Sequence, residues 1–121
     1  MLTFDLMAID TPPYTRDEPT RAALDAMQGP TLVEFGTDWC GYCRAAQSLI
    51  AGALAGHPPL RHLKIEDGPG RPLGRSFRVK LWPTLIFMHH GKEVARLVRP
   101  SDPETINEAL AQQARAAQAA A

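Results

Sequence analysis

Two cysteines carry the most reactive side chains of this 121-residue chain, and they stand three positions apart, as Cys40 and Cys43. A Cys-x-x-Cys pair can supply half of a zinc site, close a structural disulfide, or pass electrons by opening and closing a disulfide. A disulfide across so short a loop removes little entropy from the unfolded chain, which argues against a purely stabilising role. A zinc site needs further ligands, for which the four histidines are the candidates. Reversible redox chemistry is the favoured interpretation because of where the pair falls in the predicted structure.

The cysteine pair lies at the junction between a predicted strand and a predicted helix. Residues 31–35 form a short apolar run, typical of a buried strand. The segment after them carries apolar residues at the spacing of one buried helix face: Ala46, Leu49, Ile50, Ala53 and Leu54. Two residues three apart at a helix start lie about one turn apart, within the roughly 4.4–6.8 Å between Cα atoms that a disulfide needs.

The start of a helix also favours one cysteine as the nucleophile. Its unpaired N–H groups and partial positive charge stabilise a thiolate. Cys40 stands at the N-terminal end of the predicted helix, and Cys43 stands one turn inside it. We therefore expect Cys40 to attack a substrate disulfide and Cys43 to resolve the mixed disulfide.

The rest of the chain alternates between predicted strands and helices. The segments are a helix from 17 to 28, a strand at 60–65, a short helix at 73–77, a hairpin of strands 84–88 and 93–98, and a last helix opened by a capping box at 101–104. The order is (β)αβαβαββα, an α/β fold with a central mixed sheet and helices on both faces. We interpret residues 1–16 as an N-terminal segment with a possible edge strand over 2–9, and residues 17–121 as one domain.

Charge and composition narrow the partners and the compartment. Thirteen basic and thirteen acidic side chains balance, which leaves no electrostatic footprint for nucleic acid or an anionic membrane. No apolar run approaches the roughly 18 residues that a membrane-spanning helix requires. The N-terminus lacks the basic region of a secretory signal, and two neighbouring cysteines do not suit a secreted disulfide scaffold. We expect a cytoplasmic protein with neither nucleic acid nor membrane as a partner.

Four blocks of sequence, in order and at suitable separations, resemble the thioredoxin family. They are residues 32–35, 39–43 (Trp-Cys-Gly-Tyr-Cys), 82–87 (Trp-Pro-Thr-Leu-Ile-Phe) and 91–94, and the similarity covers roughly residues 20–112. The resemblance implies the thioredoxin fold, a reversible Cys40–Cys43 disulfide without a bound cofactor, and protein disulfides as substrates. It also implies a thioredoxin reductase as the electron source. We expect the protein to be a monomer.

The resemblance also assigns roles to residues around the cysteines. It implies that Pro83 follows a cis peptide bond and that Trp82, Pro83 and Thr84 hold an extended substrate segment beside the reactive sulfur. The residues around the nucleophile, Trp39, Gly41 and Tyr42, are expected to line the same surface.

Glu34 takes the place of the carboxylate that the family buries under the cysteine pair. We expect burial to raise its pKa, so that it can relay a proton to or from Cys43. Lys64 is the expected partner of Glu34, although a buried pair without a relay role is an equally open reading.

Several positions depart from the family pattern. Gly41-Tyr42 replaces a Gly-Pro pair, Glu34 replaces an aspartate, Trp82 replaces a smaller residue, and Arg99-Pro100 stands where a family glycine helps to form the groove. These changes leave the substrate range and the reducing strength open. A series of basic residues is interpreted as a solvated face that can bias which partners dock: Arg71, Arg75, Arg78 and Lys80. The alternative function is a redox-silent thioredoxin-fold module that binds proteins through the groove beside Pro83.

Overall fold

A computed structural model describes residues 12–120 of the chain. Its elements, in chain order, are α2 (Arg21–Asp25), β1 (Pro30–Gly36), α3 (Gly41–Ala55), β2 (Arg61–Glu66), α4 (Pro72–Ser76), β3 (Thr84–His89), β4 (Lys92–Val98) and α5 (Pro103–Ala120). This order confirms the predicted α/β class and the predicted sequence of elements. The possible edge strand over residues 2–9 lies outside the described residues.

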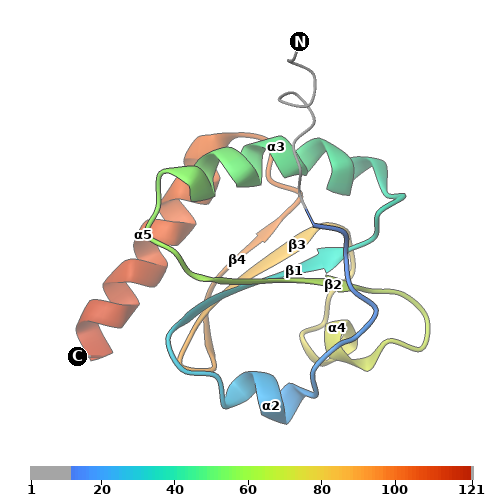
Figure 1. Cartoon of the computed structure of the whole chain (residues 1–121), viewed down its shortest axis with the longest axis horizontal. Helices are drawn as coiled ribbons and strands as arrows, with labels where there is room; N and C mark the ends of the chain where they lie inside the picture. Colours follow the sequence, from blue (N-terminus) through green and yellow to red (C-terminus); the bar gives the residue numbers. More distant parts are fainter. Residues whose placement is uncertain (1–11, 121) are drawn as a thin grey trace.

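A four-stranded mixed sheet, in the order β2-β1-β3-β4, forms the centre of the fold. β1 pairs in parallel with β2 and antiparallel with β3, and β3 pairs antiparallel with β4 (Figure 1). Because β1 has a neighbour on each side and helices over each face, every residue from Thr31 to Gly36 is buried. The end of this central strand leads directly to the cysteine pair.

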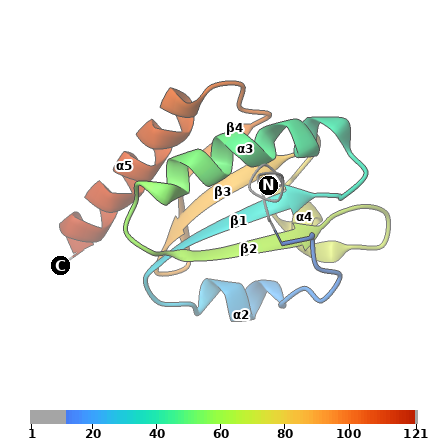
Figure 2. The same ribbon diagram turned by 45° about the horizontal axis from the view of Figure 1, so that its top comes forward.

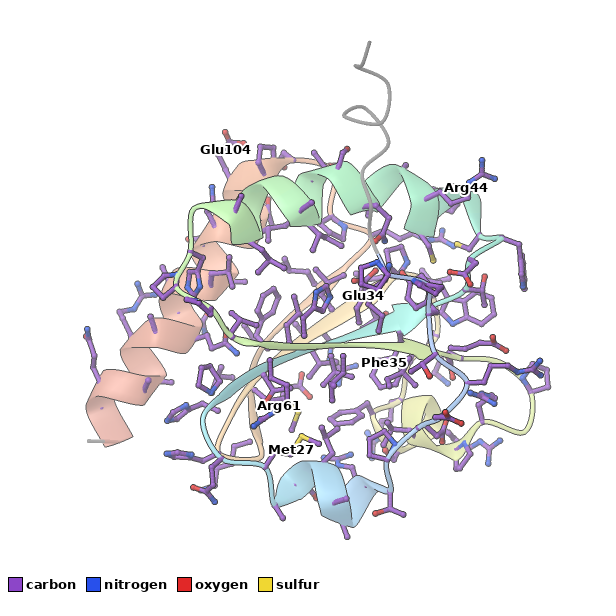
Figure 3. The ribbon with its side chains drawn as sticks, viewed as in Figure 1. Met27, Glu34, Phe35, Arg44, Arg61 and Glu104 are labelled. Carbon is purple, nitrogen blue, oxygen red and sulfur yellow. The ribbon has the colours of Figure 1, made fainter. Side chains whose placement is uncertain are left out.

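Helices cover both faces of the sheet, as the sequence predicts. α3 and α5 lie over one face, and α2 and α4 lie over the other (Figures 1 and 2). Successive residues of a strand point to opposite faces, so Leu32 packs under α3 and α5 while Val33 and Phe35 pack toward α2 and α4. Figure 3 shows Glu34 on the α3 side of the sheet and Phe35 on the opposite side. The alternation therefore buries a carboxylate directly beneath the helix that carries the cysteines.

The predicted hairpin between β3 and β4 closes through a two-residue turn. Both His90 (φ 50°) and Gly91 (φ 77°) are left-handed, the conformation of a type I′ turn. A Cβ at position 91 would lie 1.8 Å from the carbonyl oxygen of Asp25, so only glycine fits there. His90 also connects the turn to the segment before β1, because its Nδ1 accepts a hydrogen bond from the backbone N–H of Gly29, 2.9 Å away.

Two helix starts differ from the sequence prediction. The first helix begins at Arg21 rather than at position 17, because the Thr20 hydroxyl accepts a hydrogen bond from the N–H of Ala23 and so caps it. The last helix is capped by Asp102 rather than by Ser101. Its Oδ1 accepts hydrogen bonds from both the backbone N–H and the hydroxyl of Thr105, at 2.8 and 2.7 Å.

Candidate active site

Cys40 is the N-cap residue of α3. Its backbone is extended (φ −78°, ψ 122°), and its Sγ accepts a hydrogen bond from the N–H of Cys43, 3.2 Å away. The sulfur thus takes the place that a serine or aspartate oxygen fills at other helix starts. Cys40 retains 8% of its exposure, whereas Cys43 is fully buried. The two sulfurs are not bonded to each other in this structure.

Cys43 is held as a thiol at neutral pH. Burial and the neighbouring Cys40 sulfur raise the pKa of Cys43, hydrogen bonds from the Thr37 backbone and the Tyr14 hydroxyl offset part of the effect, and the net pKa is about 12. A sulfur that is protonated at neutral pH needs a base before it can attack. The buried cysteine is therefore the one that depends on its surroundings for a proton acceptor.

Glu34 lies beneath the cysteine pair, fully buried, with three side chains donating to its carboxylate. Oε2 accepts from the Tyr14 hydroxyl and from Nε2 of Gln47 (2.8 Å), and Oε1 lies 2.9 Å from Nε2 of His62. Burial raises the pKa of this carboxyl, but the hydrogen bonds from His62, Tyr14 and Gln47 outweigh it, so the pKa lies below its usual value. The expectation of a raised pKa is wrong because the sequence did not reveal these donors. Glu34 is a carboxylate at neutral pH.

Lys64 does not pair with Glu34, although it stands next to it in the register of β1 and β2. Its ammonium group donates instead to Oε1 of Gln47 (2.8 Å) and to the carbonyl of Pro12, and it lies 4.6 Å from the centroid of the Tyr14 ring. Gln47 thereby links the two charged groups, because its Nε2 binds Glu34 while its Oε1 binds Lys64. The predicted ion pair is replaced by a bridge through an amide.

Tyr14 places its hydroxyl between the carboxylate and the buried thiol. A Cβ on Gly36 would lie 2.8 Å from the Tyr14 hydroxyl and 2.6 Å from the Cys43 Sγ, so both groups crowd around the same point of β1. The segment that carries Tyr14 is anchored beside β2, where Thr15 exchanges two backbone hydrogen bonds of 2.8 Å with Lys64 and Glu66. Position 36 must be a glycine for the thiol and the hydroxyl to fit.

The peptide bond between Trp82 and Pro83 is cis, as the resemblance implies. The carbonyl oxygen of Trp82 lies 4.0 Å from the Sγ of Cys40, and the indole N–H of Trp82 donates to Asp67 over 2.9 Å. The Thr84 hydroxyl donates to the carbonyl of Leu81, which fixes the start of β3. The cis-proline segment therefore borders the outer cysteine directly.

Two exposed aromatic side chains rim the same area. Trp39 is 74% exposed and meets the Trp82 ring edge-on, with 5.7 Å between ring centroids. Tyr42 is 60% exposed, and Gly41, the first residue of α3, has open space beside it. Large apolar rings that stay exposed next to a reactive group are typical of a surface that contacts another molecule.

Arg99 ties the cis-proline segment to the rim. It is left-handed (φ 51°), and its backbone N–H donates to the carbonyl of Pro83 over 2.9 Å. Its Nε donates to the Trp82 carbonyl over 2.8 Å, and its guanidinium lies 3.7 Å from the centroid of the Tyr42 ring. A cation thus stands where the family pattern has a glycine.

Sequence reasoning missed three members of this site: Tyr14, Gln47 and His62. Gln47 is one helical turn beyond Cys43, and residues four apart on a helix share a face, so the spacing alone could have found it. His62 alternates with Lys64 on β2 and therefore shares the Glu34 face. Tyr14 comes from a segment with no periodic pattern, and nothing local in the sequence marks it.

In the described part of the chain, no three histidine, cysteine or acidic side chains lie close enough together to hold a metal ion, so the structure shows no ligand set for zinc there. His62 is engaged with Glu34, and the Nδ1 of His57 lies against the carbonyl of Pro58. Among residues 12–120, no helix combines the length and the apolar character needed to cross a membrane.

The sequence model of one protein family, thioredoxin, matches residues 14–112. The chain belongs to the thioredoxin family. Thioredoxin 2 from Pseudomonas aeruginosa PAO1, solved in its reduced form, is 53% identical and superposes with a TM-score of 0.79, covering 88% of this chain and 99% of that one. The thioredoxin of Chlamydia muridarum (strain MoPn / Nigg) is 35% identical over 79 residues, 64% of this chain and 76% of its own length.

Membership in the thioredoxin family identifies the chemistry of the site. The protein is a thiol–disulfide oxidoreductase that works through the Cys40–Cys43 pair. The chain is also similar to protein disulfide-isomerases, which are a related class of enzyme. Protein disulfide-isomerase from Hordeum vulgare is 34% identical over 89 residues, which are 68% of this chain but 17% of that larger protein. The family thus leaves the direction of electron flow to be argued from the site.

Proposed function

We propose that this thioredoxin-family protein reduces disulfide bonds of other proteins, with Cys40 as nucleophile and Cys43 as resolving thiol. The observation that carries the assignment is the contrast between Cys40, which caps α3 and keeps 8% of its exposure, and a fully buried Cys43. The Cys40 thiolate attacks one sulfur of the substrate and expels the other as a thiolate. Cys43 then attacks the Cys40 sulfur, which releases the second substrate thiolate and leaves the Cys40–Cys43 disulfide. The substrate gains two electrons, and the protein loses them.

The proton of Cys43 leaves through Tyr14 to Glu34. As Cys43 attacks, its proton passes to the Tyr14 oxygen while the hydroxyl proton of Tyr14 passes to Oε2 of Glu34. The hydrogen bond from Tyr14 to Glu34 supports this route, and the ionised carboxylate is free to accept the proton. The two pKa values by themselves favour the proton on Cys43, so the transfer is driven by the S–S bond that forms as the proton leaves. The relay returns the proton when the disulfide is reduced again.

The substrate segment binds along the cis-proline surface beside Cys40. Trp82, Pro83 and Thr84 supply one side, and Trp39 with Tyr42 supplies an exposed aromatic rim. Gly41, with open space around it, lets the substrate backbone approach the start of α3. The 4.0 Å contact between the Trp82 carbonyl and the Cys40 Sγ supports the placement of a substrate sulfur at this point.

The remaining assignments follow from the family. Electrons come from a thioredoxin reductase, no bound cofactor is required, and the protein acts as a monomer in the cytoplasm. Two cysteines three positions apart, without others spread along the given sequence to close large loops, support a reducing compartment.

Trapping tests the assignment of the two cysteines. The Cys43→Ser variant should accumulate mixed disulfides with oxidised protein substrates through Cys40, because nothing resolves them. The matched Cys40→Ser variant should trap little, since its remaining thiol is buried. If neither variant forms mixed disulfides, and the unaltered protein does not reduce the disulfides of these substrates, the protein is a redox-silent binding module. If Cys40→Ser traps more than Cys43→Ser, the two roles are reversed.

A further inference from the structure

Arg99 carries hydrogen-bonding capacity that the fold does not use. Its Nε is committed to the Trp82 carbonyl, and its plane rests on the Tyr42 ring. Within residues 12–120, no carboxylate lies within ion-pair distance of this guanidinium, and its two terminal nitrogens make no hydrogen bond. A partly buried, oriented guanidinium with free donors is suited to binding a carboxylate with two parallel hydrogen bonds.

A second cationic area borders the same tryptophan. A cleft of about 540 Å³ lies beside the Trp82 indole, and three of the basic residues that line it are exposed and make no ion pair in the described chain: Arg75, Arg78 and Lys80. A fourth, Arg71, is engaged with Glu18 and with backbone carbonyls. One acidic side chain also lines the cleft, Asp67, and it accepts the indole N–H of Trp82. Positive charge therefore exceeds negative charge on this side of Trp82.

The positive character is local and not a property of the whole chain. The protein carries equal numbers of acidic and basic side chains, so it exerts no general attraction on acidic proteins. Only a substrate whose acidic residues come close to Trp82 gains from Arg99 and the cleft. Opposite charges that meet at an interface raise the association rate and discourage like-charged partners.

We propose that Arg99 and the basic cleft beside Trp82 select protein disulfides flanked by acidic residues. This inference rests on the proposed function, because it concerns the substrates of the same site. Arg99 binds a carboxylate next to the reacting half-cystine, and Arg75, Arg78 and Lys80 hold acidic residues farther along the segment. The aromatic rim of Trp39 and Tyr42 contacts the substrate without regard to its charge.

The test compares three disulfide-bonded peptides that are identical except for Glu, Gln or Lys on both sides of the cystine. The rate constant for reduction of each by the reduced full-length protein is measured at low salt. We expect the Glu peptide to exceed the Lys peptide by about tenfold, and the ratio to collapse toward one in about 0.5 M salt. Reduction of the Gln peptide reports the proposed function alone, so its failure would overturn that function instead of the selectivity.

Variants assign the selectivity to residues. Arg99→Gly, which tolerates the left-handed backbone, should lower the Glu-to-Gln rate ratio about fivefold, while Arg99→Lys should retain part of the preference. The rate on the Gln peptide reports what the lost hydrogen bond to the Trp82 carbonyl costs for any substrate. Arg75→Gln combined with Lys80→Gln should lower the Glu-to-Lys ratio further. Arg115→Gln, an exposed arginine on α5, is the matched control and should change nothing. Equal rates for all three peptides, or an equal loss on all three in Arg99→Gly, would overturn the proposal.

Discussion

The hydroxyl of Tyr14 donates a hydrogen bond to Oε2 of Glu34 at the point where it also borders the buried thiol of Cys43. This relationship connects an acid with a lowered pKa to a thiol with a raised one. The carboxylate is ionised and the thiol is protonated at neutral pH, so the pair begins in the states that proton transfer requires. Tyr14 thus gives the buried carboxylate a route to the thiol.

Replacing Tyr14 by Phe removes the hydroxyl and keeps the ring that packs beside the cysteines. The step in which Cys43 attacks should slow by roughly tenfold or more, since a positioned base contributes about 10²–10⁴ to such a step. The attack by Cys40 should change little. Stopped-flow reaction with Ellman's reagent separates the two, because Cys40 releases the first thiolate in a bimolecular step and Cys43 releases the second in a unimolecular one.

The pH profile of the same variant distinguishes proton transfer from a structural defect. Without the hydroxyl, Cys43 must lose its proton to the solvent, so the unimolecular rate should rise steadily with pH, because burial raises the pKa of Cys43 far above neutrality. The unaltered protein should show a weaker dependence around neutral pH. Parallel profiles for the two proteins would show that Tyr14 serves packing alone.

Glu34 makes the free energy of unfolding depend on pH in a predictable direction. Its pKa in the folded state lies below the usual value near 4.5, at which it titrates in the unfolded chain. Between the two values the unfolded state binds more protons, so this contribution is complete above the usual pKa and is lost as the pH falls through the folded pKa. Glu34→Gln should therefore lose stability at pH 7 and lose less of it on acidification.

Urea unfolding at a series of pH values measures this effect. The difference in unfolding free energy between the unaltered protein and Glu34→Gln should narrow below about pH 4.5, because protonation removes what the carboxylate contributes. Glu108→Gln, at an exposed position of α5, is the control for a change of net charge. A difference that stays constant with pH would contradict the lowered pKa of Glu34.

Gly36 and Gly52 offer a matched pair of substitutions to alanine. At position 36 the new Cβ would meet the Cys43 sulfur at 2.6 Å and the Tyr14 hydroxyl at 2.8 Å, whereas at position 52, inside α3, it meets nothing within 4 Å. Gly36→Ala should destabilise the protein by about 1–3 kcal/mol and slow the second step of the Ellman reaction. Gly52→Ala should stabilise it by roughly 0.5–1 kcal/mol. An unchanged second step in Gly36→Ala would mean that the crowding around Gly36 does not matter to Cys43.

The sequence predicts the architecture well because the signals of the sheet and its helices are local. The apolar run before Cys40, the helical spacing after Cys43 and the turn at His90-Gly91 each leave a periodic or conformational mark. Helix starts are predicted less well. Thr20 and Asp102 cap their helices, but the sequence places other residues of cap-forming types beside them, and it does not show which one accepts the hydrogen bond.

The polar surroundings of Glu34 are harder to predict because they come from three distant segments. His62, Gln47 and Tyr14 lie 28, 13 and 20 positions away in sequence, and only the packing of β2, α3 and the segment before α2 brings them together. Burial alone predicts a raised pKa for Glu34, and burial together with three donors lowers it. The direction of the pKa shift of Glu34 therefore could not be predicted before the structure showed these three donors together.

The equilibrium redox potential of the Cys40–Cys43 couple tests the proposed direction of electron flow most directly. The potential is measured by titrating the protein in glutathione or dithiothreitol buffers and following the disulfide. A cytoplasmic reductant should have a value near that of thioredoxin, about −270 mV. A value near that of protein disulfide isomerase, about −180 mV, would make the protein an isomerase or oxidant and contradict the account. Failure to form any reversible disulfide would contradict it more completely.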